Sequence, residues 1–470
     1  MRNLVKSFGT LILVAWLVLF VGFATAGGKE EEPAPAEEAL KVVTIRVWTI
    51  GPDNPALGRK TAFDEAGKRL NKDLEAEGSN IRVNVEAEFN SVNWSSFKQR
   101  NLLALQTGDP EQIADIIMTG HEMIGPYSVA GYIVPLDDYI ARYPEVYNDI
   151  FPALWATGEF KAKIWGIPRD SEGRLIWIRR DVLKKIGWTE SEIDGLRERA
   201  FAGDFTRDDL SDLAKDIKDA GVVETTMIHR PTPGVDWLGL IWNYGGRLSD
   251  ETTGKLVVTK SACLKALEYL DKLVNQLGVV PSSMTNWSWP DINGSFLEGR
   301  AALYLTGGVW QWLGWQKDPW NFTEEWLFEN ITWIPYAAAK KGGKPLSVSH
   351  PLTCMLTSVS QNKDLAFRLL TYQYAPDLQA ESVLASGHLA IGQSILEYPA
   401  YKENRYRSEV TRLLDVTRIS PNHIKAPFLW EAWMDAIKAV ETGAMNPSGA
   451  LDFFVARMQQ ELGNEVIVEE

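Results

Sequence analysis

The sequence predicts an α/β protein folded as two lobes. The chain has 470 residues, more than a single hydrophobic core usually serves, so two domains are expected. A β-branched run at residues 41–50 is followed by a helical pattern, an alternating segment at 81–89, a second helical pattern at 97–105 and an apolar run at 114–118. Strands that alternate with helices in this way indicate a mostly parallel sheet.

The rest of the chain shows the same elements with more helix. We expect short strands at 164–167, 174–178, 301–305, 331–335 and 353–356, and helices at 261–277, 364–374, 427–440 and 449–462. These patterns predict a second α/β lobe with a helical tail. The chain is expected to cross between the lobes more than once.

The first lobe indicates where a ligand would bind. Ligands of parallel α/β sheets bind in the crevice outside the carboxyl ends of the strands. That rule points to residues 51–54, 91–94 and 119–122. The polar and aromatic candidates that they contain are Asp53, Asn54, Trp94 and Glu122.

The N-terminus has the pattern of an export signal. Arg2 and Lys6 precede an apolar run at 11–20, and Ala-Thr-Ala at 24–26 is typical of a cleavage site. We therefore expect a signal peptide at 1–26, followed by a flexible acidic linker at 27–39. An uncleaved membrane anchor is the alternative, because the apolar stretch nearly spans a bilayer.

Composition excludes several classes of function. The formal net charge of −14 argues against nucleic acid and anionic lipid as partners. No CxxC, HExxH or EF-hand loop occurs, so neither a metal nor a cofactor is expected.

Cys263 and Cys354 either pair or are two buried apolar side chains, and we favour the second. The 19 tryptophans stand out, since Trp is enriched where flat apolar faces meet ligands.

Five segments of the chain stand in an order that is typical of one protein family. They are ADIIM (114–118) with VPLDD (134–138), KAKIWGIPRD (161–170), SFLEGRAALY (295–304) with GGVW (307–310), NKDLA (362–366), and Pro421-Asn422 through Trp430. Each segment alone is weakly specific, but together, between residues 44 and 462, they resemble the extracellular solute-binding proteins of bacterial ATP-binding-cassette sugar importers, of the maltose- and oligosaccharide-binding type. No cysteine near the cleavage site provides the family's usual lipid attachment.

The resemblance implies a fold and a division of the chain. It implies the type II periplasmic-binding-protein fold, two α/β lobes joined by crossing hinge segments with the ligand in the cleft between them. Lobe one would comprise 40–163 and 337–397, and lobe two 164–336 and 398–470. It also implies a monomer in the periplasm, or outside the cytoplasm, that delivers its ligand to the membrane permease subunits of the transporter.

The resemblance also implies binding residues. Trp310 and Trp430 match positions at which sugar-binding members stack an aromatic ring on the ligand, although both also suit core packing. Glu122 matches a carboxylate that accepts hydrogen bonds from hydroxyl groups, or it is a solvated acid at a helix start. Asp170 and Glu172 lie where the family supplies polar ligand contacts.

Other candidates follow from the residues themselves. Asp236 and Trp237 lie in a Pro-Gly loop that opens a helix, and Trp94 begins the helix after the second strand. Flat aromatic faces and planar polar groups suit a carbohydrate. Together with them, the resemblance implies a binding protein for a di- or oligosaccharide rather than an enzyme. Capture of a non-sugar solute and an exported glycoside hydrolase are the alternatives, the second requiring two facing carboxylates.

Overall fold

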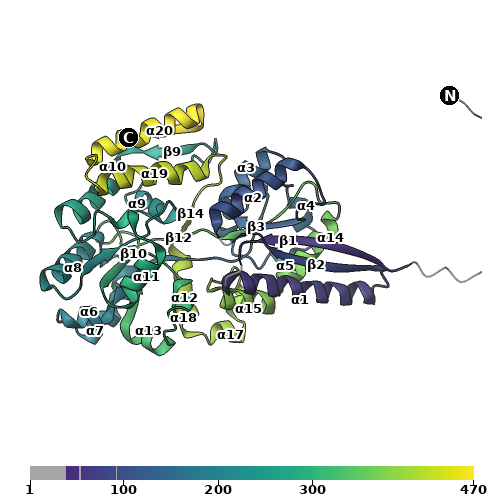
Figure 1. The fold of residues 1–470 in the computed structure, drawn as a ribbon, viewed down its shortest axis with the longest axis horizontal. Coiled ribbons are helices and arrows are strands. Elements are labelled where there is room, and N and C mark those ends of the chain that lie inside the picture. The colour runs from purple at the N-terminus through teal and green to yellow at the C-terminus, as the bar shows by residue number, and fades with distance from the viewer. Residues whose placement is uncertain (1–38, 52–53, 92) are drawn as a thin grey trace, which may run out of the picture. The chain divides into compact units, whose positions relative to one another are not determined.

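The structure has two large β-sheets, each with its own helices (Figure 1). It is a computed structural model that describes residues 39–51, 54–91 and 93–470. The predicted signal peptide, nearly all of the predicted linker and Asp53 lie outside the described residues. The two-lobed α/β architecture predicted from the sequence is confirmed.

The first sheet has five strands. β1 pairs in parallel with β2 and β3, and β13 runs antiparallel between β3 and β6. The carboxyl ends of β1, β2 and β3 therefore lie at one edge, together with the start of β13, where Leu352 faces Gly120. In order of pairing the strands are β2 (Ile81–Phe89), β1 (Lys41–Thr49), β3 (Ile116–Gly120), β13 (Leu352–Leu356) and β6 (Ile167–Pro168).

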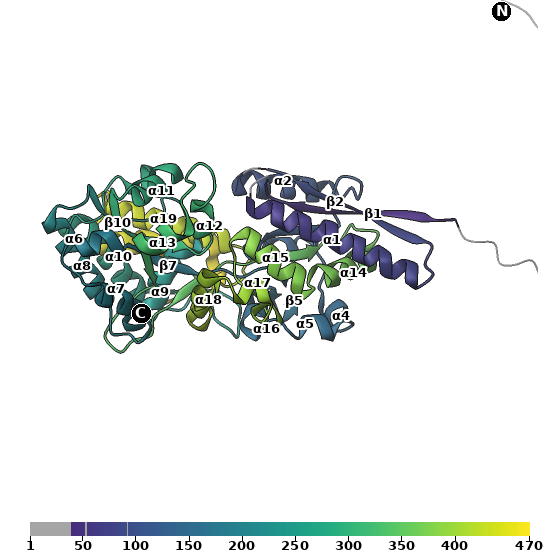
Figure 2. The ribbon, with the colours of Figure 1, turned by 90° about the horizontal axis from the view of Figure 1, so that it is seen from below.

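Helices cover both faces of this sheet. Alternate residues of β1 such as Val43, Ile45 and Val47 join the core beneath α1 and α14, while Trp48 joins a smaller core with α2 and α3. Figure 2 shows α1 and α15 side by side, and Arg69 of α1 bonds Asp377 of α15 at 2.6 Å. The helices are α1 (Asn54–Ala76), α2 (Trp94–Thr107), α3 (Ile124–Val129), α4 (Asp137–Ile140), α5 (Pro144–Tyr147), α14 (Lys363–Gln373), α15 (Pro376–Ser386), α16 (Gln393–Leu396) and α17 (Pro399–Lys402).

The second sheet has four strands inside the larger core. β7 runs antiparallel to β10 and β11, and β8 pairs in parallel with β10. Its strands, in order of pairing, are β11 (Ile331–Ile334), β7 (Arg174–Arg179), β10 (Ala301–Gly308) and β8 (Thr225–Ile228). The helices around it are α6 (Arg180–Lys185), α7 (Glu190–Phe201), α8 (Arg207–Ala220), α9 (Leu238–Asn243), α10 (Lys260–Asp271), α11 (Trp289–Leu297), α12 (Gln311–Trp315), α13 (Glu324–Asn330), α18 (Arg405–Val410), α19 (Ala426–Glu441) and α20 (Pro447–Leu462).

Three segments of chain connect the lobes. They lead from β6 to β7, from β11 to β13, and from α15 to α19. Inside them, β12 (Ser347–Ser349) pairs in parallel with β14 (Thr417–Ile419), and Ser171 exchanges backbone hydrogen bonds with Leu389. The sequence analysis starts lobe two at residue 164, but β6, at Ile167–Pro168, still pairs with β13 of the first sheet. The exact residues at which the chain leaves each lobe stay a prediction.

Two short strand pairs complete the fold. β9 (Leu256–Thr259) pairs with β15 (Val466–Glu469), and β4 (Glu159–Phe160) pairs with β5 (Lys163–Ile164).

Cys263 and Cys354 are free and buried, as favoured from the sequence, and burial raises the pKa of each thiol to about 12. Within the described ranges, no helix is both long and apolar enough for a membrane span, and no group of three or more candidate ligands is placed to hold a metal ion.

Candidate ligand-binding site

Glu122 lies at the carboxyl edge of the first sheet, in the short helix η1 (His121–Met123) directly after β3. Its side chain is buried and accepts hydrogen bonds from Lys98 Nζ at 3.2 Å and from His350 Nε2 at 2.6 Å. Burial by itself would raise the pKa of this carboxyl, but His350 and Lys98 hold the pKa well below its usual range. Glu122 is therefore an ionised hydrogen-bond acceptor.

Trp430 reaches the same place from α19. Its indole ring meets the ring of His350 edge to face, with the centroids 5.2 Å apart. Trp430 is half-buried, and its Nε1 atom has no hydrogen-bond partner among the described residues. The ring of His350 thus lies between a carboxylate of lobe one and an aromatic side chain of lobe two.

Asp170 and Glu172 lie in the first crossing segment and are both buried. Asp170 accepts from the backbone N–H of Leu352 at 3.2 Å, and Glu172 accepts from that of His350 at 3.0 Å. Each carboxylate therefore binds the second crossing segment. Asp170 also pairs with Arg59 at 3.5 Å.

Arg174 continues this arrangement into lobe two. It pairs with Glu172 at 2.7 Å and with Asp236 at 2.5 Å, and Asp236 also pairs with Arg230. Burial, together with the charge of Arg174, lowers the pKa of Arg230 to about 10, so the guanidinium group of Arg230 is still charged at neutral pH. Asp236 therefore bridges two cations.

Trp310 lies over this group of charges. The guanidinium carbon of Arg174 is 4.3 Å from the centroid of its ring, and the ring of His388 lies nearly parallel to it. A Cβ atom at Gly308 would lie 2.0 Å from the Trp310 ring. Glycine at 308 therefore lets the ring fold back over the end of β10.

These contacts form one continuous row across both lobes. We call it the charged row, and it has three cations and three anions besides His350. Because each carboxylate pairs with at least one cation, the row has no surplus charge with which to attract an ionic solute. The members, in order of contact, are Lys98, Glu122, His350, Glu172, Arg174, Asp236 and Arg230.

The structure places some of the candidates from the sequence at the charged row and others outside it. Glu122, Glu172 and Asp236 belong to the charged row, and Trp310 and Trp430 contact it. The other described candidates, Trp237, Asp170, Trp94 and Asn54, are not members of the row.

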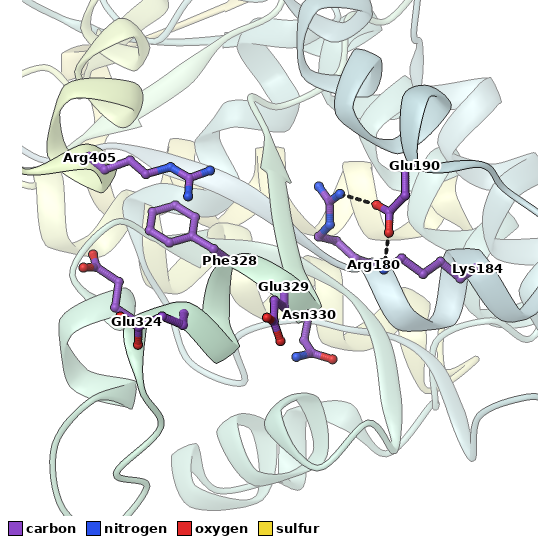
Figure 3. Close-up of a pocket in the computed structure, with 9 residues that line it drawn as sticks. Arg180, Lys184, Glu190, Glu324, Phe328, Glu329, Asn330 and Arg405 are labelled. Carbon is purple, nitrogen blue, oxygen red and sulfur yellow. Dashed lines mark hydrogen bonds and ion pairs between the residues drawn. The ribbon is translucent and has the colours of Figure 1, made fainter.

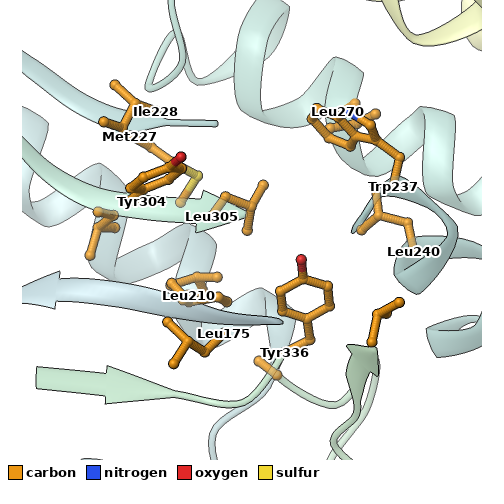
Figure 4. Close-up of a cluster of buried hydrophobic side chains, with 14 of the residues drawn as sticks. Leu175, Leu210, Met227, Ile228, Trp237, Leu240, Leu270, Tyr304, Leu305 and Tyr336 are labelled. Carbon is orange, nitrogen blue, oxygen red and sulfur yellow. The ribbon is translucent and has the colours of Figure 1, made fainter. Parts of the chain in front are cut away.

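Trp237 is a core residue. It is 1% exposed, and Figure 4 shows it beside Leu240 and Leu270. Its backbone carbonyl accepts from Trp433 Nε1 at 3.2 Å. The side chain of Trp237 therefore helps to hold η3 (Val235–Trp237), which carries Asp236, on the core of lobe two.

Asp170 and Trp94 lie beside the charged row. Asp170 faces Arg59 of α1, and Trp94 is 40% exposed at the first residue of α2, one turn before Lys98. Asn54 is the first residue of α1, and Asp53 lies outside the described residues.

Sequence reasoning missed four members of the row, Lys98, His350, Arg174 and Arg230. His350 precedes β13, whose antiparallel direction places its start beside the end of β3. A sequence pattern does not reveal strand direction, so nothing marked this position. Arg174 had a local signal, since it follows the polar segment 170–172 directly.

Two surface pockets lie away from the row. One has a volume of about 710 Å³ and is lined mainly by charged side chains, among which Glu190 bonds Arg180 and Lys184, and Arg405 lies over Phe328 (Figure 3). The other has about 950 Å³ and is lined by residues of 151–156, 242–251 and 411–421. None of the described candidates from the sequence lines either pocket.

Comparison with known proteins identifies the family. Residues 58–380 match the family described as bacterial extracellular solute-binding protein. Among similar solved structures, the GacH receptor of Streptomyces glaucescens, described unliganded and with acarbose, has a TM-score of 0.70 at 16% identity, covering 89% of this chain and 97% of that one.

Two further structures have the same fold. Maltose-bound MalE3 of T. maritima has a TM-score of 0.69 at 17% identity and covers 90% of this chain and 100% of its own. The sugar-binding protein MalE of Xanthomonas citri has a TM-score of 0.69 at 18% identity, with coverage of 89% and 97%.

Proposed function

We propose that this chain, which belongs to the bacterial extracellular solute-binding proteins, captures a di- or oligosaccharide between its two lobes. The observation that carries the proposal is the charged row with Trp310 and Trp430 set against it. Sugars present apolar C–H faces, which suit indole rings, and hydroxyl groups, which suit a row of fixed donors and acceptors. Acarbose and maltose in two similar structures support the same class of solute.

The charge balance of the row favours an uncharged solute. A phosphate or carboxylate would need an unpaired cation, and Arg174 and Arg230 are both engaged by Asp236. Uncharged donors are available instead. Among the described residues, the hydroxyls of Tyr304 and Tyr336 and the Nε1 atom of Trp430 are buried without hydrogen-bond partners. Such groups gain by bonding the hydroxyl groups of a ligand.

Capture works by closure of the lobes on the solute. The row runs from Lys98 in lobe one, through the crossing segments, to Arg230 in lobe two, so a sugar lying along it contacts both lobes. A ligand that contacts both lobes favours their closed arrangement by its difference in affinity for the two states. The closed protein then presents a surface made from both lobes to the permease subunits of an ATP-binding-cassette importer.

The place of action follows from this function. An importer of this kind takes its solute from a protein outside the cytoplasm, so we propose export of this chain by its N-terminal signal. The expected linker at 27–39 suits either a free or a tethered protein.

Hydrolysis of the glycan is disfavoured by the state of Glu122. A glycoside hydrolase needs one carboxyl that is protonated near neutral pH. Contacts with His350 and Lys98 lower the pKa of Glu122 instead. The carboxylate of Glu172 accepts a backbone N–H and pairs with Arg174.

Calorimetric titration of the protein with a panel of mono- and oligosaccharides tests the proposal. We expect micromolar or tighter binding, about −8 kcal/mol, of at least one sugar without product formation. Trp310→Ala and Trp430→Ala should each weaken that binding about 30-fold, the equivalent of about 2 kcal/mol for loss of a stacking ring.

A matched control separates binding from folding. Trp188 is half-buried and packs against the core of lobe two. Trp188→Ala should lower the melting temperature and leave the affinity unchanged. If Trp310→Ala binds the sugar with full affinity, the Trp310 ring is not part of the site. If no sugar of the panel binds the wild-type protein, the ligand is not a carbohydrate.

A further inference from the structure

His121 directly precedes Glu122, and both nitrogen atoms of its ring face one segment of chain. Its Nδ1 atom lies 2.8 Å from Oδ1 of Asn422, and its Nε2 atom lies 3.5 Å from the hydroxyl of Ser420. The side chains of His121 and Ser420 are both buried. Asn422 and Ser420 belong to the third crossing segment, which leads from α15 to α19. This segment therefore holds the ring at both of its nitrogen atoms.

The amide of Asn422 fits in only one orientation. Its nitrogen donates to the backbone carbonyls of Thr157 at 2.8 Å and Glu159 at 2.9 Å, and carbonyl oxygens only accept. The amide oxygen consequently faces His121, so Nδ1 of the ring carries the proton of that hydrogen bond. Burial lowers the pKa of the ring to about 4, so the ring is neutral and its Nε2 can accept from Ser420. The third crossing segment thus selects one tautomer of a neutral imidazole.

The contacts around Glu122 leave its carboxylate little room to move. The rings of His121 and His350 lie with their centroids 5.0 Å apart, and His350 donates to Glu122. A Cβ atom at Gly120 would overlap both the carboxylate of Glu122 and the ring of His350. With the other tautomer of His121, lone pairs of Nδ1 and of the Asn422 oxygen would face each other, and the ring would turn against His350. A change at His121 therefore reaches Glu122 through His350.

The third crossing segment also leads to the aromatic side of the site. It continues into α19, which carries Trp430. It packs closely on lobe one as well, because a Cβ atom at Gly125 of α3 would lie 2.5 Å from the carbonyl carbon of His423. The hydrogen bonds of His121 therefore connect the backbone beside Glu122 with the segment that ends in Trp430. These are two of the groups proposed to contact the sugar.

We propose that Asn422 is a positioning residue of the sugar site: by holding His121 in the Nδ1–H tautomer, it fixes Glu122 in the place relative to Trp430 that the sugar requires. The inference rests on the proposed function and deepens it, since neither Asn422 nor His121 needs to touch the ligand. Hydrogen bonds behind a binding group keep that group in its productive geometry, so their loss weakens binding although the group itself remains.

Histidine-selective ¹⁵N spectra, together with calorimetry, test this role. The chain has five histidines, and the signals of His121 are those that vanish in His121→Asn. In the wild-type protein at pH 7, His121 should show a protonated Nδ1 and an unprotonated Nε2. Asn422→Ala should remove this preference and weaken binding of a sugar identified by the panel about tenfold. A wild-type ring with its proton on Nε2, or on both nitrogens, would overturn the inference.

Further variants separate positioning from a general loss of stability. His121→Ala should weaken binding about as much as Asn422→Ala, and the double variant no more than either, because Asn422 acts through His121. His121→Asn should bind nearly as well as the wild type, since its amide nitrogen replaces Nδ1 as the donor to Asn422. Asn71→Ala is the matched control: the amide of Asn71 in α1 also bonds backbone, at Val83, so its loss should lower stability and leave sugar affinity unchanged.

The outcomes distinguish this role from the proposed function. Wild-type affinity in both Asn422→Ala and His121→Ala would overturn the role and leave carbohydrate binding intact. Additive losses in the double variant, or binding by His121→Asn as weak as by His121→Ala, would contradict it too. If Asn422→Ala does not fold, the comparison of His121→Ala with His121→Asn decides. Failure of the whole sugar panel to bind the wild-type protein would overturn the function and the role together.

Discussion

At the scale of single residues, burial keeps two histidine rings near the charged row uncharged at neutral pH. Burial lowers the pKa of His121 to about 4, with His350 acting in the same direction and Glu122 opposing it. Burial also lowers the pKa of His388 to about 4, against the opposing charge of Asp170. Both rings are therefore neutral imidazoles in the folded protein at neutral pH.

These two rings make stability depend on pH. Below pH 6.5 the unfolded chain binds a proton on each ring, whereas the folded chain does so only near pH 4, so the free energy of unfolding falls as the pH drops between these values. From pH 7 to pH 5 the loss should be about 2 kcal/mol for each ring. Carboxylates with lowered pKa, such as Glu122, lose their contribution only at pH values below about 4.3.

Urea unfolding at pH 7 and pH 5 measures this effect. His388→Gln removes one of the two rings and should lose less stability between the two pH values than the wild type does. An equal loss in the variant and the wild type would contradict a buried, uncharged His388.

At the scale of elements, buried carboxylates join the crossing segments. Asp170 and Glu172 alternate along the first segment, and each accepts a backbone N–H of the second. The hydroxyl of Ser347 accepts from the backbone N–H of Arg174. This geometry favours Asp170 as a hinge residue more than as a ligand contact.

A double-mutant cycle tests that role. Asp170→Asn keeps an acceptor for Leu352 but leaves the guanidinium of Arg59, 3% exposed, without its carboxylate. We expect a loss of about 3 kcal/mol in the free energy of unfolding, because an unpaired buried charge is costly. Adding Arg59→Met should recover part of that loss, and a fully additive double variant would show that the pair does not interact.

Much of the secondary structure could be predicted, and the departures have local causes. The strand expected at 301–305 continues to Gly308 as β10, because Gly307 and Gly308 pair with Leu175 and Arg174 beyond an irregularity in the register. Helices α7 and α8 were not predicted, since both are rich in charged residues. Their capping boxes, begun by Thr189 and Thr206, were the available signals.

The candidate site could be predicted only in part. Trp310, Trp430 and Glu122 lie in recognisable local motifs, and the structure places all three at the charged row. The partners are not local. His350 bonds Glu122 from 228 residues away, and Arg174 meets Asp236 from 62 residues away, so only the folded arrangement of the lobes shows these pairs.

At the scale of the whole molecule, we expect sugar binding to bring the two lobes together. Distance measurement between two spin labels tests this, with Leu103→Cys on α2 in lobe one and Met445→Cys beyond α19 in lobe two, both exposed positions. The natural thiols, Cys263 and Cys354, are buried with raised pKa and should stay unlabelled.

The distance between the two spin labels, measured with and without a sugar that calorimetry has shown to bind, is the most direct test of capture between the lobes. We expect saturating sugar to shorten the mean distance, a non-binding sugar to leave it unchanged, and Trp310→Ala to need about 30-fold more sugar for the same shortening. An unchanged distance distribution at saturating sugar would contradict closure of the two lobes on the ligand.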